Sequence, residues 1–263
     1  MGHVADASGS ISRRRFGQMT GGALASAIVS PVVGCAIDTS ALQNLEGRLS
    51  VRTKGGVRTT ASGTQRLGLE QARDAILQMP AAIPSSPIPL LVLLHGAGGS
   101  AERQLMRMGS APSDAGVAVL APDSRGGTWD AIRGRFGPDV SFLNRALGRV
   151  FDLVSVDPAR LVIGGFSDGA SYALSLGLIN GRLFRKIAAF SPGFVVPGEP
   201  DGKPRVFISH GTHDDILPID RCGRVIAQRL RAGSYDVTFR EFDGGHEIPP
   251  AIARDGLSWC AQS

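Results

Sequence analysis

Short apolar runs alternate with longer stretches of helical spacing along most of this chain. Runs such as Leu90–Leu94 have no polar alternation, which is typical of parallel strands covered on both faces. The predicted strands are Arg73–Met79, Leu90–Leu94, Val117–Leu120, Leu161–Gly164, Lys186–Phe190, Val206–Ser209 and Val237–Phe242, and the predicted helices are Glu102–Met108, Val140–Leu153, Ala170–Leu178, Asp220–Arg231 and Pro250–Cys260. This alternation predicts a doubly wound, mostly parallel central sheet with helices on both faces.

One folded domain is predicted over residues 49–263, because a chain of 263 residues can bury one sizeable core. The Gly-interrupted run over residues 49–60 is predicted to be an edge hairpin. The Pro- and Ser-rich segment 81–89 is predicted to be a loop. The sequence contains no run of eighteen apolar residues of the kind that spans a membrane.

Residues 1–35 have the features of an export signal. The segment Ser12–Phe16, with its three consecutive arginines, resembles the motif that the bacterial twin-arginine export machinery recognises. A stretch rich in Gly, Ala and Ser follows, and Val32–Cys35 resembles a lipoprotein box, in which the cysteine is lipidated. The resemblance predicts export to the periplasm or cell envelope, with Cys35 as a lipid anchor and residues 36–48 as a tether.

A different cleavage point remains possible within this signal. A simple exported protein would be cut near Ala25–Ala27, although that cut leaves a very short apolar region. The signal also contributes Arg13, Arg14 and Arg15 to the formal net charge of +5. The remaining arginines are scattered and are not interleaved with aromatic residues, which is typical of a solvated surface. The sequence therefore predicts no nucleic-acid partner.

Cys222 and Cys260 are the cysteines that remain after Cys35. An oxidising compartment permits a disulfide between them. Twin-arginine substrates fold first in the reducing cytoplasm, however, and the two predicted helices near these cysteines are compatible with opposite faces of the sheet. A disulfide and two buried thiols both remain open.

The most informative stretch for chemistry is Leu161–Leu174, where a Gly-Phe-Ser-Asp-Gly turn joins an apolar strand to an Ala/Leu-rich helix. Such a turn is typical of a nucleophile elbow, with Ser167 at its tip. Gly165 and Gly169 lack a Cβ, so the strand and the helix can approach closely. The helix N-terminus favours a developing negative charge. The same pattern also occurs in βα turns without chemistry and in turns that bind phosphate, so its function depends on its partners.

A serine hydroxyl needs a base to remove its proton, and the base needs a third group to orient it. Among the downstream histidines, His246 follows the last predicted strand in an Asp-Gly-Gly-His loop, where functional groups collect in open α/β sheets. Asp214 and Asp215 follow an earlier strand and compete for the role of the acid. A metal site built on His210, His213 and Asp214 is disfavoured because no further ligand cluster exists. His210 is expected to pack beneath its loop.

These motifs, in this order, resemble small esterases of the α/β-hydrolase superfamily, above all the phospholipase/carboxylesterase group and the related feruloyl-esterase and polyhydroxybutyrate-depolymerase-like esterases. Their acid loop has the pattern His-Gly-x-x-Asp-x-x-(Val/Leu)-Pro, which aligns its aspartate with Asp214 and makes Asp215 a variable position. His95–Gly99 resembles their His-Gly loop. The resemblance implies that the backbone N–H groups of Ala97 and Asp168 form the oxyanion hole.

The resemblance implies a serine hydrolase of carboxylic esters with the triad Ser167, His246 and Asp214, an acyl-enzyme intermediate, and no metal or organic cofactor. Short connections after the elbow leave no room for a large lid. Trp129 and Phe194 either line the substrate pocket or belong to the core. A triad does not choose the final acceptor, so an acyltransferase or a peptidase is the alternative enzyme. A catalytically idle, tethered binding protein is the alternative outside enzymes.

Overall fold

A computed structural model describes residues 46–54 and 62–262 of the chain. The export signal over residues 1–35, Cys35 and most of the tether lie outside the described residues, so these assignments stay predictions. None of the helices in the described part combines the length and the apolar character that crossing a membrane requires.

The core of the structure is an eight-stranded sheet with the strand order β1-β2-β4-β3-β5-β6-β7-β8. The strands are β1 (Gly63–Arg66), β2 (Ala75–Met79), β3 (Ile88–Leu94), β4 (Ala118–Pro122), β5 (Val156–Phe166), β6 (Lys186–Phe190), β7 (Arg205–Gly211) and β8 (Val237–Phe242). The pairs β1–β2 and β2–β4 are antiparallel, and every other pair is parallel. The predicted doubly wound, mostly parallel sheet is therefore confirmed.

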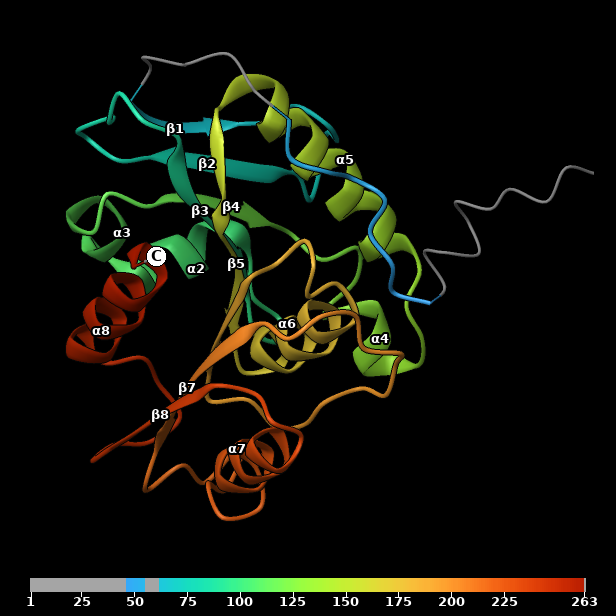
Figure 1. The fold of residues 1–263 in the computed structure, drawn as a ribbon, viewed down its shortest axis with the longest axis vertical. Helices are drawn as coiled ribbons and strands as arrows, with labels where there is room; N and C mark the ends of the chain where they lie inside the picture. The colour runs from blue at the N-terminus through green and yellow to red at the C-terminus, as the bar shows by residue number, and fades with distance from the viewer. Residues whose placement is uncertain (1–45, 55–61, 263) are drawn as a thin grey trace, which may run out of the picture. The chain divides into compact units, whose positions relative to one another are not determined.

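Helices cover both faces of this sheet (Figure 1). They are α2 (Ala101–Met108), α3 (Ala111–Asp114), α4 (Asp130–Arg133), α5 (Pro138–Leu153), α6 (Asp168–Ile179), α7 (Gly223–Ala232) and α8 (Pro250–Ala261). One hydrophobic cluster joins the sheet to α4, α5, α6 and α7, and a second joins its other face to α2, α3 and α8. All seven residues of β3 are buried, which explains its uninterrupted apolar sequence.

The two C-terminal cysteines are kept apart by this arrangement. Cys222 directly precedes α7 on one face, whereas Cys260 lies in α8 on the other face. Both are buried free thiols. Burial raises the pKa of the Cys260 thiol to about 12, so this sulfur stays protonated at neutral pH. Of the two alternatives open from the sequence, the structure has the two buried thiols.

The predicted edge hairpin over residues 49–60 is wrong for its described part. Residues 49–54 form no strand, and residues 55–60 lie outside the described residues. The segment packs instead by side-chain caps, because the Leu49 N–H donates to Asn180 Oδ1 at 2.8 Å and the Ser50 N–H donates to Asn144 Oδ1 at 2.9 Å. The antiparallel edge strand is β1, which begins at Gly63 and has only exposed residues.

The parallel strands bring their C-terminal ends to one edge of the sheet. The register pairs Leu94 with Gly165 between β3 and β5, and Gly211 with Phe242 between β7 and β8. The loops after these four strands therefore begin near the same edge, which is where open α/β sheets carry ligand sites.

Candidate active site

Ser167 lies between β5 and α6 in a backbone conformation that few non-glycine residues adopt, with φ 56° and ψ −120°. Its N–H donates to the Phe190 carbonyl at 3.0 Å, which helps hold the turn. A Cβ on Gly169 would lie 2.4 Å from the Leu94 carbonyl oxygen, and one on Gly165 would lie 2.5 Å from the backbone of Gly169. The two glycines thus allow the close packing that keeps the strained serine in place.

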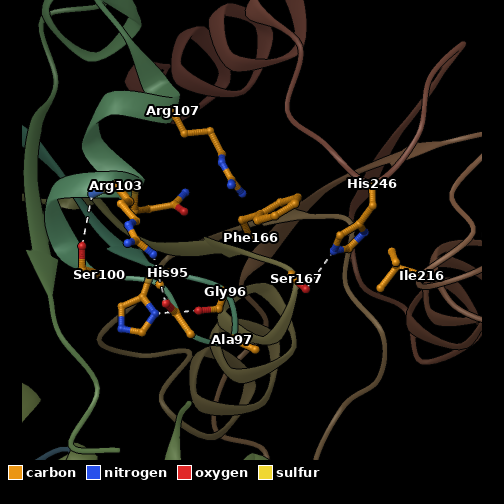
Figure 2. A pocket seen from close by; sticks show the side chains of 13 residues that line it. His95, Gly96, Ala97, Ser100, Arg103, Arg107, Phe166, Ser167, Ile216 and His246 are labelled. Atoms are coloured by element: carbon orange, nitrogen blue, oxygen red, sulfur yellow. Dashed lines mark hydrogen bonds between the residues drawn. The ribbon is translucent and has the colours of Figure 1, made fainter. Parts of the chain in front are cut away.

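The three predicted triad residues meet at this turn. His246 Nε2 lies 2.9 Å from Ser167 Oγ (Figure 2), and His246 Nδ1 lies 2.7 Å from Asp214 Oδ2. The other oxygen of this carboxylate, Oδ1, accepts hydrogen bonds from the N–H groups of Ile216 (3.1 Å) and Leu217 (2.8 Å). Asp214 is buried, whereas the neighbouring Asp215 is exposed. The geometry therefore selects Asp214 as the partner of the histidine.

The loop that carries His246 is packed tightly against the loop that carries Asp214. The His213 N–H donates to the Gly244 carbonyl at 2.9 Å, and a Cβ on Gly211 would lie 2.3 Å from the Gly245 carbonyl oxygen. The His246 ring also contacts the Phe166 ring, with centroids 4.7 Å apart. These contacts orient the imidazole from two sides.

A second histidine, His210, contacts the carboxylate of Asp214. It is fully buried, and its Nε2 lies 2.7 Å from the Leu217 carbonyl oxygen and 3.1 Å from Asp214 Oδ2. Both neighbours are acceptors, so Nε2 carries the proton and donates to them. Burial lowers the pKa of His210 and keeps the ring neutral. The expected packing beneath the loop is thus accompanied by a direct contact with the carboxylate, which the sequence did not reveal.

A pH dependence of stability follows from the lowered pKa of His210. Below its ordinary pKa near 6.5, the unfolded chain takes up a proton that the folded ring resists, so this group destabilises the fold as the pH falls. We expect the free energy of unfolding to fall less between pH 7.5 and pH 5.5 in His210→Gln than in the wild type. Urea unfolding at both pH values measures this difference. Equal pH slopes for the two proteins would contradict it.

The comparison of slopes is needed because other groups titrate in the same range. Burial also lowers the pKa of His95, which adds to the loss at low pH. Burial raises the pKa of Asp139 to about 6, so this carboxyl stabilises the fold as the pH falls from 6 toward 4. Both contributions are the same in the two proteins and cancel from the difference.

The predicted oxyanion donors belong to two segments that meet near Ser167. Ala97 lies in the loop after β3, and Asp168 is the first residue of α6. Within the described ranges, neither backbone N–H donates a hydrogen bond to the protein. Gly96, which precedes Ala97, packs against Ser167, because a Cβ on Gly96 would lie 3.3 Å from the Ser167 Cβ. Two unoccupied N–H donors near a serine hydroxyl are the arrangement that an oxyanion hole requires.

The His-Gly loop is held in place by residues that follow β4. His95 Nε2 accepts from the Ser124 N–H at 3.0 Å, so its proton lies on Nδ1, which donates to the Gly96 carbonyl at 2.7 Å. Trp129 is fully buried, and its Nε1 donates to the His95 carbonyl at 2.8 Å. Of the two roles left open for Trp129, the structure thus shows core packing. Phe194 is 42% exposed and is not among the residues that line the pocket beside Ser167.

A pocket of about 340 Å³ opens beside Ser167 (Figure 2). Its floor is the His-Gly loop, and one of its walls comes from α2. The site predicted from the sequence did not include α2. The signal was present, because this helix begins directly after the loop that carries Ala97. Among the described residues no group of three or more His, Cys, Asp or Glu side chains is placed to hold a metal ion.

Part of the chain matches a known protein family. Residues 145–256, which include Ser167, Asp214 and His246, match the family described as Phospholipase/Carboxylesterase. Acyl-protein thioesterase 1 of Gibberella zeae is 31% identical over 103 residues, which are 35% of this chain and 43% of that protein. The protein of the same name from Emericella nidulans is 28% identical over 110 residues, 38% of this chain and 46% of that protein. The chain therefore spans less than half the length of these curated relatives.

Solved structures match more of the chain. The crystal structure of esterase PE8 covers 70% of this chain and 97% of its own, with 23% identity and a TM-score of 0.56. The Bacillus cereus carboxylesterase covers 73% of this chain and 94% of its own, with 21% identity and a TM-score of 0.55. The chain has the α/β-hydrolase fold, and the family match over residues 145–256 supports an esterase-type hydrolase with this fold.

Proposed function

We propose that this protein is a serine hydrolase that cleaves carboxylic esters through an acyl-enzyme. The observation that carries the proposal is the continuous contact from Ser167 Oγ through His246 to Asp214, at 2.9 Å and 2.7 Å. Both distances are within hydrogen-bond reach, and the base is oriented by a buried carboxylate, as nucleophilic catalysis by serine requires. The similarity to proteins named carboxylesterase and acyl-protein thioesterase supports the same class of reaction.

In the proposed mechanism, Ser167 Oγ attacks the ester carbonyl carbon while His246 Nε2 takes the hydroxyl proton. The carbonyl oxygen becomes an oxyanion, which accepts from the N–H groups of Ala97 and Asp168. Collapse of this intermediate breaks the ester bond, and His246 returns the proton to the leaving alcohol. Water then attacks the acyl-enzyme by the same steps. Asp214 keeps the imidazole in the correct tautomer and stabilises the imidazolium.

A fluorophosphonate probe tests this function, because an activated serine displaces its fluoride and becomes labelled. We expect the wild type to be labelled and Ser167→Ala to remain unlabelled, with hydrolysis of p-nitrophenyl butyrate lost in parallel. Ser258→Ala is the matched control, because Ser258 is an exposed serine on α8. Labelling should persist in this control.

The outcome also separates the alternatives that the sequence left open. A folded wild-type protein that is not labelled and does not hydrolyse p-nitrophenyl butyrate would contradict the enzyme proposal and favour a binding protein. Labelling together with cleavage of amides but not of esters would favour a peptidase. An acyltransferase would release nitrophenol faster when an acceptor alcohol is added than in water alone.

A further inference from the structure

The pocket beside Ser167 has a wall with an unusual set of hydrogen-bond donors. Arg103, Gln104 and Arg107 of α2 all line it, and Figure 2 shows the two arginine side chains extending from this helix into the site, with Arg107 beside Phe166. Positions i and i+4 lie on the same side of a helix, where like charges repel and destabilise it. Both side chains are exposed, so water solvates their charges and the mutual repulsion is only about 0.2–0.5 kcal/mol.

No acidic side chain within the described ranges neutralises these two arginines. The Arg103 guanidinium has only a long contact, 3.4 Å, to the Gly98 carbonyl, and neither guanidinium is in a salt bridge with another described residue. The nearby acids are already engaged: Glu102 pairs with Arg66, and Asp123 accepts from the Ala101 N–H. The positive charge of the wall is thus left facing the pocket.

Arg107 is held in position by an aromatic ring of the site. Its guanidinium carbon lies 4.1 Å from the centre of the Phe166 ring, and that ring in turn contacts His246. Stacking of this kind uses the face of the guanidinium and leaves the N–H groups at its edge free to bind a ligand. The Phe166 ring therefore lies between the positive charge of Arg107 and the imidazole of His246.

Gln104 supplies an independent observation at the same wall. Its side chain is only 2% exposed, and its Nε2 has no hydrogen-bond partner among the described residues. Buried amide donors are nearly always paired in proteins, so Gln104 adds one unsatisfied donor to the residues of this wall. The nitrogens of the two guanidinium groups and of the Gln104 amide are all hydrogen-bond donors, so a ligand that binds this wall must offer acceptors. The two positive charges favour a ligand that is an anion.

We propose that this wall is a carboxylate subsite, an inference that rests on the proposed esterase function. The enzyme would then prefer substrates that carry a free carboxylate in addition to the ester. The two oxygens of a carboxylate match the planar fork of a guanidinium. A pocket of about 340 Å³ is at the small end of ligand sites, so the carboxylate lies a few bonds from the ester that Ser167 attacks. The exposed Ile216 on the opposite side offers apolar contact to the short chain between them.

Matched pairs of esters test this preference on each side of the ester bond. On the acyl side, p-nitrophenyl hemiglutarate is compared with its neutral methyl ester, by release of nitrophenol. On the alcohol side, the butyryl ester of 4-hydroxybenzoate is compared with phenyl butyrate. We expect kcat/KM to be at least about 10-fold higher for the anionic member of one pair, the size of one charge-assisted hydrogen bond. Raising the salt concentration should reduce the ratio.

The variant Arg107→Met removes the charge and keeps an apolar side chain over Phe166. It should lose most of the preference for the anionic ester, measured as the ratio of kcat/KM values for the two members of a pair within the same variant. Arg229→Met, at an exposed arginine of α7, makes the same change in net charge away from the pocket and should keep the preference. Fluorophosphonate labelling of Arg107→Met checks that the triad is intact.

The results distinguish failure of the subsite from failure of the esterase. Equal kcat/KM values within both ester pairs, in a wild type that is labelled and hydrolytic, would overturn the subsite and leave the esterase proposal standing. The subsite is also overturned if Arg107→Met and Arg229→Met reduce the preference equally, because the effect would then come from overall charge. Absence of both labelling and hydrolysis would overturn the esterase proposal, and the subsite proposal would fall with it.

Discussion

Replacing Asp214 by Asn is expected to lower kcat for ester hydrolysis by about 10⁴-fold, with little change in fold. Asp214 Oδ1 accepts from two backbone N–H groups, so an Asn at this position keeps its oxygen there and turns its NH₂ toward His246. His210 then loses its contact with the Asp214 side chain and keeps its shorter hydrogen bond, at 2.7 Å, to the Leu217 carbonyl. The His246 ring must then accept at Nδ1 and carry its proton on Nε2. That proton faces Ser167 Oγ, and the histidine can no longer act as the base.

The neighbouring carboxylate provides the matched control for this prediction. Asp215→Asn makes the same chemical change one residue away at an exposed position, and it should leave kcat within about twofold of the wild type. Steady-state kinetics with p-nitrophenyl butyrate measure both variants, and circular dichroism checks the fold. A larger loss of kcat in Asp215→Asn than in Asp214→Asn would show that Asp215, and not Asp214, is the acid of the triad.

Replacing Gly169 by Ala is expected to cost about 3 kcal/mol or more of stability and to abolish activity. The new Cβ would lie 2.4 Å from the Leu94 carbonyl oxygen and 2.5 Å from that of His95. Both are backbone atoms at the end of β3, so neither can move aside as a flexible side chain does. Overpacking of this kind typically costs about 1–3 kcal/mol, and a clash with fixed backbone lies at the upper end.

Gly148→Ala is the matched control for the elbow. Gly148 lies within α5, and a Cβ there meets no atom within 4 Å, so this variant should gain about 0.5–1 kcal/mol of helix stability. Thermal unfolding of the two variants measures the contrast, with about 2–4 °C expected per kcal/mol for a chain of this size. Similar melting temperatures for both variants would show that the elbow is not closely packed in solution.

The strands of the parallel sheet were predictable because each one is a short, uninterrupted apolar run. The predicted bounds of β6 and β8 agree with the structure, and those of the other parallel strands differ only by residues at their ends. The short helices α3 and α4 were not predicted, because four residues do not complete a hydrophobic period. The predicted hairpin is wrong over its described residues, 49–54, because the Asn144 and Asn180 side chains accept hydrogen bonds from the N–H groups of residues 49–51 in place of a neighbouring strand.

The chemistry of the site was predictable to the extent that it lies at the ends of strands. Ser167, Asp214 and His246 each follow a predicted strand within a distinctive turn or loop, so local sequence indicated them separately. The structure brings them within hydrogen-bond distance. Their catalytic role, like that of the Ala97 and Asp168 amides, stays a prediction that the labelling and kinetic experiments address.

Local sequence alone determined that this chain forms strands and helices in alternation and that Ser167 lies at a tight turn, because both depend on neighbouring residues. Only the tertiary structure decided that His210 contacts the Asp214 carboxylate, that Cys222 and Cys260 lie on opposite faces, and that α2 forms a wall of the pocket. These contacts join segments far apart along the chain. Their distances depend on how the sheet twists and how the helices pack, which no local pattern encodes.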